Sequence, residues 1–354
     1  MSTVTVLNQY SHLGNIMSFT PYGNGHINTT SLVECSDGCR YILQRINTSV
    51  FTDPEGLMKN VAAVTEHIRK QVALSGQDTS RCTLRIIRTD SGAALCRDNE
   101  GGCWRMYDYV EGTVAKDTVD NADMFELCGE AFGLFQQQLS DFDANRLSTV
   151  IPNFHNTPIR YEAFLRSVER DAAGRASRVQ KEIEFVRERA EFMQTLERAH
   201  AQGRLPLRVT HNDTKLNNIL FDAVSSRPVC VIDLDTVMPG YSVNDFGDSI
   251  RFGANTASED EQDLSLVSLD LELYRRYAVG FLRGFGDAMT DDERALLPIG
   301  ARMMTLECGM RFLADYLDGD VYFRTHRPNH NLDRARCQLA LVADMERKQE
   351  QMRI

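Results

Sequence analysis

Residues 207–218 read Leu-Arg-Val-Thr-His-Asn-Asp-Thr-Lys-Leu-Asn-Asn, and residues 229–235 read Val-Cys-Val-Ile-Asp-Leu-Asp. The first stretch has the spacing H-x-D-x-K-x-x-N, in a loop between predicted strands at 207–209 and 219–221. Transfer of a phosphoryl group requires a carboxylate to orient the attacking hydroxyl, oxygen ligands for Mg²⁺ and positive charge near the phosphates. The two stretches supply all of these groups, so together they predict a phosphotransferase.

Four residues of these stretches are expected to take separate roles in that chemistry. Asp213 is the predicted base, and Lys215 is the predicted cation that offsets charge on the transferred phosphoryl group. Asn218 and Asp233 are the predicted metal ligands, because Mg²⁺ prefers oxygen donors and completes its shell with waters and phosphates. The alternative from another class is a pseudokinase, which binds nucleotide and a partner without catalysis.

A second motif lies further along the chain. Asp245-Phe246-Gly247 spells the D-F-G of protein kinases, which holds a metal there. Here it follows a Pro-Gly turn instead of coming directly after a strand, so Asp233 fits the metal role better. We predict that Asp245 and Asp248 are structural and hydrogen-bond the catalytic loop or Arg251, with direct metal binding as the alternative.

The overall composition excludes several classes of protein. The 354 residues are 42% hydrophobic and 25% charged, as in soluble globular proteins, and the length suggests two domains. The net charge of −11 argues against a nucleic-acid-binding surface. No stretch is apolar enough for a membrane span and no signal peptide is visible, so we expect a cytoplasmic protein. The nine cysteines are then expected to be free thiols, with a zinc site as the disfavoured alternative.

Hydrophobic periodicity divides the chain into a strand-rich and a helix-rich part. Before residue 112 we predict one helix at 57–71 and strands at 16–22, 29–33, 40–45, 84–87 and 104–107. After it we predict helices at 124–139, 182–200, 271–285 and 301–317, and short strands at 207–209, 219–221 and 229–232. The pattern predicts an α/β fold of two lobes: a small antiparallel-sheet N-lobe at 1–112 and a larger, mostly helical C-lobe at 113–354.

The turn between the first two predicted strands is rich in glycine. Gly23 and Gly25 would let the backbone approach phosphates, and His26 and Asn28 offer hydrogen-bond donors. Two glycines in a hairpin are weak evidence by themselves. Beside a phosphotransferase loop, they predict a cover over the nucleotide.

At this point the chain resembles the aminoglycoside phosphotransferase and choline kinase-like superfamily, which is related to the protein kinases. Within it, longer blocks resemble the N-acetylhexosamine 1-kinases, over about residues 21–334. The blocks are 21–30 (Pro-Tyr-Gly-Asn-Gly-His-Ile-Asn-Thr-Thr), 41–44 (Tyr-Ile-Leu-Gln), 207–218, 233–236 (Asp-Leu-Asp-Thr), 245–254 (Asp-Phe-Gly-Asp-Ser-Ile-Arg-Phe-Gly-Ala) and 307–317 (Glu-Cys-Gly-Met-Arg-Phe-Leu-Ala-Asp-Tyr-Leu).

The resemblance implies an ATP- and Mg²⁺-dependent kinase with a protein kinase-like fold. Its acceptor would be the anomeric C1 hydroxyl of N-acetylglucosamine or N-acetylgalactosamine, and its products the α-1-phosphate and ADP. The sugar would contact Asp213 and the positions matching His26, Arg311 and Tyr322. The alternative is a kinase of the same fold with another acceptor: an aminoglycoside, choline, homoserine or methylthioribose.

The resemblance also places the nucleotide. Backbone groups of Asp108 and Val110 would pair with adenine where the superfamily joins its lobes. Many members carry a lysine on the third strand, held by a glutamate of the helix, to contact the phosphates. Here that position is Gln44, which can hydrogen-bond a phosphate but cannot neutralise it. The source of positive charge at the α- and β-phosphates is therefore left open.

Overall fold

The computed structural model describes residues 2–23 and 27–354. Contacts divide the chain into two compact units. The first comprises Met1–Ala115, Asp141–Pro152 and Ile219–Pro239, and the second comprises Lys116–Ser140, Asn153–Asn218 and Gly240–Ile354. The turn around Asp233 thus belongs to the first unit and the loop around Asp213 to the second.

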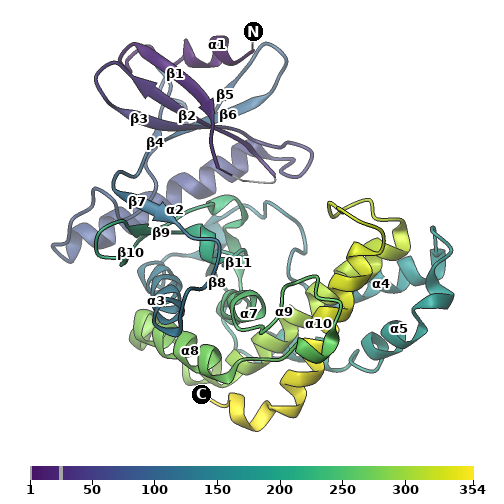
Figure 1. The fold of residues 1–354 in the computed structure, drawn as a ribbon. Coiled ribbons are helices and arrows are strands. Elements are labelled where there is room, and N and C mark those ends of the chain that lie inside the picture. The colour runs from purple at the N-terminus through teal and green to yellow at the C-terminus, as the bar shows by residue number, and fades with distance from the viewer. Residues whose placement is uncertain (1, 24–26) are drawn as a thin grey trace. The chain divides into compact units, whose positions relative to one another are not determined.

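The first unit is built around an antiparallel sheet (Figure 1). Within the described residues it has six strands, in the order β1-β2-β3-β6-β4, and β5 also pairs with β6. The strands are β1 (Ile16–Pro21), β2 (Thr29–Cys35), β3 (Arg40–Arg45), β4 (Ile86–Ile87), β5 (Cys96–Arg97) and β6 (Cys103–Asp108). The five strands predicted from periodicity are confirmed.

Alternating side chains bury one face of this sheet. Val33, Leu43 and Met106 come from three neighbouring strands and pack with Tyr10, which follows the short helix α1 (Ser2–Leu7). Strand β2 alternates as expected of a strand with one buried face, whereas β6 is buried on both faces from Cys103 to Tyr107. The core fixes the register that sets Gln44 of β3 opposite Arg105 of β6.

Helix α2 (Pro54–Leu74) extends the helix predicted at 57–71 at both ends. The Asp53 side chain accepts from the N–H of Gly56 at its N-cap, which satisfies one of the unpaired N–H groups of the first turn. Buried Asn60 donates to the carbonyl oxygens of Ser148 (2.7 Å) and Val237 (3.0 Å). This helix therefore anchors the chain just beyond the Asp233 turn.

A smaller antiparallel sheet completes the first unit. Its strands are β7 (Thr113–Ala115), β9 (Ile219–Asp222) and β10 (Pro228–Val231), in the order β10-β9-β7. After β10 come the 3₁₀ turn η5 (Leu234–Thr236) and strand β11 (Met238–Gly240), and η1 (Ala144–Arg146) lies earlier in the chain.

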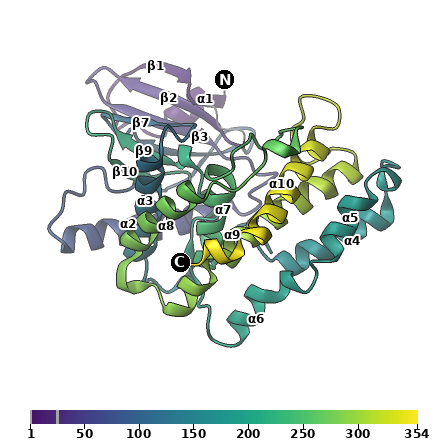
Figure 2. The same ribbon diagram turned by 60° about the horizontal axis from the view of Figure 1, so that its bottom comes forward.

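Helices form nearly all of the second unit. The α-helices are α3 (Ala122–Gln138), α4 (Thr157–Arg170), α5 (Gln180–Arg187), α6 (Thr195–Ala201), α7 (Ser242–Gly253), α8 (Leu271–Phe285), α9 (Asp291–Asp318) and α10 (His330–Arg347). The remaining elements are β8 (Arg208–Thr210), η2 (Ala176–Arg178), η3 (Phe192–Gln194), η4 (Leu216–Asn218), η6 (Leu264–Leu266), η7 (Gly286–Ala288) and η8 (Gln349–Met352). Helix α9 contacts α4, α7 and α10 (Figure 2).

Close packing of α7 against α9 positions the carboxylates of α7. A Cβ atom on Gly247 would lie 2.3 Å from the main-chain oxygen of Gly300, and one on Gly300 would lie 2.1 Å from that of Val243. The two backbones therefore touch where only glycine fits. This contact fixes the position of α7, and with it that of Asp245 and Asp248, relative to α9.

Two predicted helices differ from the structure. The prediction at 182–200 is wrong as one helix, because α5 ends at Arg187 and α6 begins at Thr195. In the break, Arg189 donates to the Phe185 carbonyl oxygen (2.7 Å) and to Glu346 of α10. Helix α9 begins at Asp291, ten residues before the predicted start, because Thr290 and Glu293 form a capping box there.

Candidate active site

The segment after β8 brings the predicted base, cation and amide together. Asp213 Oδ1 lies 2.8 Å from Nζ of Lys215. The amide nitrogen of Asn218 donates to the main-chain oxygen (2.8 Å) and to Oδ2 (3.2 Å) of Asp213. The Asn218 amide nitrogen is used in these hydrogen bonds to Asp213, so the amide oxygen is the atom that could contact a cation.

Asp245 of α7 holds the residues before Asp213. Its Oδ2 and Oδ1 accept from the N–H groups of His211 and Asn212, both at 2.8 Å, and Gln136 donates to it at 2.6 Å. Burial raises the pKa of Asp245, against these hydrogen bonds, which lower it. The predicted hydrogen bonds between Asp245 and the loop are therefore present.

Asp248 holds the residues after Asp213. Its Oδ2 accepts from the N–H of Thr214 at 3.1 Å, and its Oδ1 lies 2.8 Å from Nη2 of Arg251. Although burial opposes ionisation, the positive charges of Arg251 and Lys215 lower the pKa of Asp248. Its predicted contacts with the loop and with Arg251 are confirmed.

In the first unit, Asp233 follows β10 in a left-handed conformation, with φ 57° and ψ 58°. Residues with a side chain avoid this region, and those that occupy it cluster at functional sites. Two residues later, Asp235 Oδ1 lies 2.5 Å from Nη1 of Arg105. The turn that carries Asp233 is thus tied to the large sheet by a buried ion pair.

Arg105 also contacts Gln44, which stands where the resemblance described above would place a lysine. Its Nε donates to Oε1 of Gln44 (2.9 Å), and Gln44 Nε2 donates to Oγ1 of Thr30 (3.0 Å). Arg105 and Asp235 have side chains that are 1% and 4% exposed. Strand β6 therefore supplies a cation beside Gln44, which has no charge of its own.

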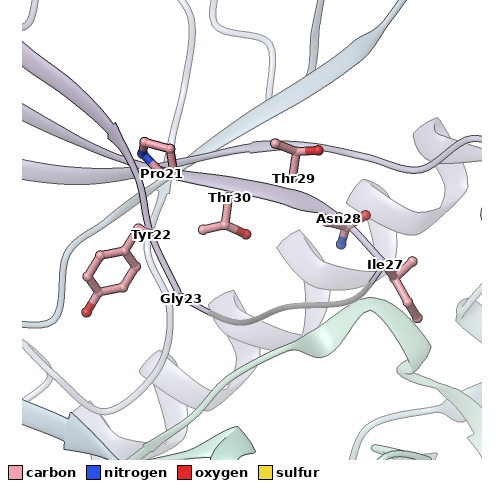
Figure 3. Close-up of a pocket in the computed structure, with 7 residues that line it drawn as sticks. All are labelled: Pro21, Tyr22, Gly23, Ile27, Asn28, Thr29 and Thr30. Carbon is pink, nitrogen blue, oxygen red and sulfur yellow. The ribbon is translucent and has the colours of Figure 1, made fainter. Parts of the chain in front are cut away.

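A pocket of about 290 Å³ lies where β1 meets β2 (Figure 3). Its lining residues are Pro21, Tyr22, Gly23, Ile27, Asn28, Thr29 and Thr30. Gly23 has φ +73°, so the turn begins in a conformation that favours glycine. The predicted residues Gly25 and His26 lie outside the described residues.

Asn28 links this pocket to the Asp233 turn. Its amide nitrogen donates to Asp235 Oδ2 (2.6 Å), and its oxygen accepts from the N–H of Asn47 (3.0 Å). Thr30 and Asn28 of the pocket wall therefore connect through Gln44, Arg105 and Asp235 into one network, of which Arg105 and Asp235 are buried. The network thus joins two residues of the pocket wall to the turn that carries Asp233.

Asp108 and Val110 lie at and just beyond the end of β6. The N–H of Asp108 donates to the carbonyl of Arg85 (3.0 Å), so its carbonyl is the group that it can offer to a nucleotide base. Its carboxylate pairs with the Arg85 side chain. The carbonyl of Val110 accepts from Oγ1 of Thr113 (2.7 Å), so at Val110 the N–H is the group to consider.

Arg311 and Tyr322 meet at the C-terminal part of α9. The guanidinium carbon of Arg311 lies 5.9 Å from the Tyr322 ring centre, 5.5 Å from that of Phe323 and 5.7 Å from that of Phe154. Buried Asp315 fixes the loop by accepting the N–H groups of Val321, Tyr322 and Phe323 at 2.8–2.9 Å. Tyr322 itself is 67% exposed, so it is open to a ligand.

Comparison with known proteins gives the family. The sequence pattern of the phosphotransferase enzyme family matches residues 18–288, well over half of the chain and including the catalytic loop. The chain belongs to this family. The predicted phosphotransferase class is thereby confirmed at the level of the family.

Solved structures agree with this phosphotransferase in fold. An aminoglycoside phosphotransferase from Alicyclobacillus acidocaldarius has a TM-score of 0.64 at 14% identity, covering 99% of this chain and 96% of its own. An amicoumacin kinase in complex with AMP-PNP and Ca²⁺ has a TM-score of 0.60 at 16% identity, and the match covers 98% of this chain and 94% of the kinase. A microcompartment-associated aminopropanol kinase has a TM-score of 0.57 at 14% identity, and the match covers 98% of this chain and 96% of that kinase. The predicted two-lobe, protein kinase-like α/β fold is confirmed.

The two residues predicted as metal ligands each carry an oxygen donor. Asn218 offers an amide oxygen and Asp233 a carboxylate, which are the donors that Mg²⁺ prefers. Separately, none of the helices in residues 2–23 and 27–354 is long and apolar enough to cross a membrane.

Three contact residues were not found by sequence reasoning: Arg105, His155 and Glu307. Each is buried and charged or chargeable, whereas a charged residue in a sequence is ordinarily read as part of a solvated face. For Arg105 a signal existed, since it lies in the middle of a buried strand between Trp104 and Met106. For His155 no local pattern points to the site.

Proposed function

We propose that this phosphotransferase is an N-acetylhexosamine 1-kinase. It would transfer the γ-phosphoryl group of ATP, with Mg²⁺, to the anomeric C1 hydroxyl of N-acetylglucosamine or N-acetylgalactosamine. The observation that carries the choice of acceptor is the cationic and aromatic wall made by Arg160, Arg311 and the rings around them. The long sequence blocks described above support the same choice.

The wall is positively charged and has few free carboxylates. The guanidinium carbons of Arg160 and Arg311 lie 6.0 Å and 5.7 Å from the centre of the same ring, that of Phe154. Burial, and after it the charge of Arg311, lower the pKa of Arg160. Glu307, on the same helix, is engaged by His155 and Thr157, and Asp315 by the N–H groups of its loop. A cationic acceptor such as choline or an aminoglycoside would meet like charge here, whereas a neutral acetylated sugar finds donors and aromatic faces.

In the proposed reaction, Asp213 orients the C1 hydroxyl and accepts its proton as the oxygen bonds to the γ-phosphorus and the bond to ADP breaks. An anomeric hydroxyl is more acidic than an ordinary alcohol, so positioning contributes more than proton affinity. Lys215 lies beside Asp213 and offsets charge on the transferred group. Mg²⁺, held by Asn218 and Asp233, would neutralise phosphate charge.

The remaining residues are proposed to contact either the nucleotide or the sugar, and we propose residue 112 as the boundary between the two lobes. Residues 1–112 would bind the nucleotide and 113–354 would carry the base and most of the sugar contacts. The nucleotide contacts would be Gly23, Gly25, Asn28, Gln44, Asp108 and Val110. The sugar contacts would be His26, Asp213, Arg311 and Tyr322.

One assay tests the proposal. ATP and Mg²⁺ are supplied with N-acetylglucosamine, N-acetylgalactosamine, plain hexoses, choline, homoserine, methylthioribose and an aminoglycoside, and ADP release is measured. We expect release with the acetylated sugars, and a ³¹P signal coupled to the anomeric proton of the product. Turnover with choline or the aminoglycoside and none with the sugars would contradict the proposed acceptor.

Replacing Asp233 with alanine is expected to raise the Mg²⁺ concentration for half-maximal activity. Loss even of a residue that supports a ligand reduces metal affinity about 10–100-fold, so loss of a ligand should have at least that effect. A Mg²⁺ titration of activity at saturating ATP and acceptor measures it. Asp141→Ala, which removes a carboxylate that pairs with His67 in the same unit, is the control. An unchanged titration in Asp233→Ala would remove Asp233 from the ligand set.

A further inference from the structure

A buried histidine lies between α9 and the catalytic loop. His155 Nδ1 lies 2.8 Å from Oε1 of Glu307, and its Nε2 lies 3.2 Å from the main-chain oxygen of Asn212. The side chains of His155 and Glu307 are 9% and 1% exposed. The second oxygen of Glu307 accepts from Oγ1 of Thr157 (2.6 Å). Asn212 directly precedes Asp213, so this pair reaches the residue next to the proposed base.

The contacts determine the charge of the ring. The Glu307 carboxylate and the Asn212 carbonyl oxygen are both acceptors. His155 can therefore donate to the two of them at once only when both of its ring nitrogens carry a proton. Asp248 of α7 adds a second negative charge near the ring, and Arg311 faces Glu307 from the same helix. Although burial lowers the pKa of His155, Glu307 and then Asp248 raise it above its ordinary value. The same pairing lowers the pKa of Glu307 against its burial.

The carbonyl that His155 holds belongs to an unusual residue. Asn212 has φ 65°, in the left-handed region that residues other than glycine avoid. Its N–H is held by Asp245 of α7 at 2.8 Å, and its carbonyl by His155. The two peptide planes on either side of Asn212 are therefore both held: Asp245 holds the one before it, and His155 holds the one that joins it to Asp213.

We propose that His155, as an imidazolium paired with Glu307, is a positioning residue that clamps the Asn212 carbonyl and so aims the Asp213 carboxylate at the acceptor hydroxyl. The proposal rests on the proposed role of Asp213 as base. It adds a buried charged pair, from outside the H-x-D motif, to the groups on which turnover depends.

The clamp predicts a pH dependence with a definite sign. When folding raises the pKa of a histidine, its ion pair is fully present at a pH below the ordinary pKa of histidine. The pair is lost as the pH rises through the pKa that the histidine has in the folded protein. A neutral ring can donate to Glu307 or to Asn212, but not to both. Turnover should therefore fall on the alkaline side as His155 loses its proton.

The test compares pH profiles of kcat for the wild type and for Glu307→Gln. Without the carboxylate, the pKa of His155 falls, and the alkaline limb is expected to move to lower pH by about 1–3 units, the usual effect of a nearby opposite charge. Asp318→Asn is the matched control, because Asp318 lies on the same helix but pairs with Arg170. If Glu307→Gln is active and the alkaline limb of its kcat profile coincides with that of the wild type, the proposed role of His155 is wrong.

A second measurement does not need activity or a variant. The ring of His155 in the substrate-free wild type is titrated by NMR after backbone-linked assignment, and it should lose its proton clearly above pH 6.5, the usual histidine value. A titration at or below that value overturns the proposal. Absence of turnover with every acceptor would instead contradict the proposed function, and the titration would still decide the charge of His155.

Discussion

Replacing Asp213 with asparagine is expected to reduce kcat by about 10²–10⁴-fold, the usual contribution of a positioned general base. Asparagine has nearly the same shape, but its amide cannot accept the proton of the acceptor hydroxyl. The substitution also removes the charge that faces Nζ of Lys215. Turnover is measured as ADP release at saturating substrates, and nucleotide affinity is measured separately by calorimetry.

Nucleotide affinity should be nearly unchanged in Asp213→Asn, because the residues proposed to contact ATP lie elsewhere. Asp120→Asn controls for the loss of one negative charge, since Asp120 is half exposed and its carboxylate pairs with Lys116. Turnover close to that of the wild type would exclude Asp213 as the base. A parallel loss of nucleotide affinity and turnover would indicate a disturbed loop instead of a lost base.

The grouping of Asp213, Lys215 and Asn218 could be predicted from sequence because it is local. Asp213, Lys215 and Asn218 lie within six positions, so one turn of chain brings them together whatever surrounds them. The contacts of Asp245 and Asp248 with this loop, and of Asp248 with Arg251, were also predicted. Strand β3 and helix α8 have the predicted bounds, because each has a clear period and a clear stop.

The rest depended on contacts between distant segments. His155 and Glu307 are 152 positions apart, and Arg105 and Asp235 are 130 apart (235 minus 105). No spacing rule joins such pairs, and even for Arg105, whose place in a strand hints at burial, the sequence does not name the partner. The broken helix at 188–194 has the same cause, because the contact of Arg189 with Glu346 of α10 competes with continued helix.

Replacing Arg105 with methionine is expected to lower the free energy of unfolding by about 3–5 kcal/mol, the effect of breaking one side of a buried ion pair. The loss arises because Asp235 would stay buried with its charge unpaired, and Gln44 would lose its donor. Chemical denaturation followed by circular dichroism measures the change. Arg97→Met on β5 is the control, since its ion pair with Glu55 is exposed and its removal should change little.

The double variant Arg105→Met, Asp235→Asn separates stability from function. Removing both charges should restore a large part of the lost stability, because no unpaired charge remains buried. If Arg105 also provides the positive field that a lysine provides in related kinases, the double variant should keep a raised KM for ATP although it is folded. Full recovery of ATP affinity with stability would restrict Arg105 to a structural role, and a stable single variant would show that Asp235 finds another partner.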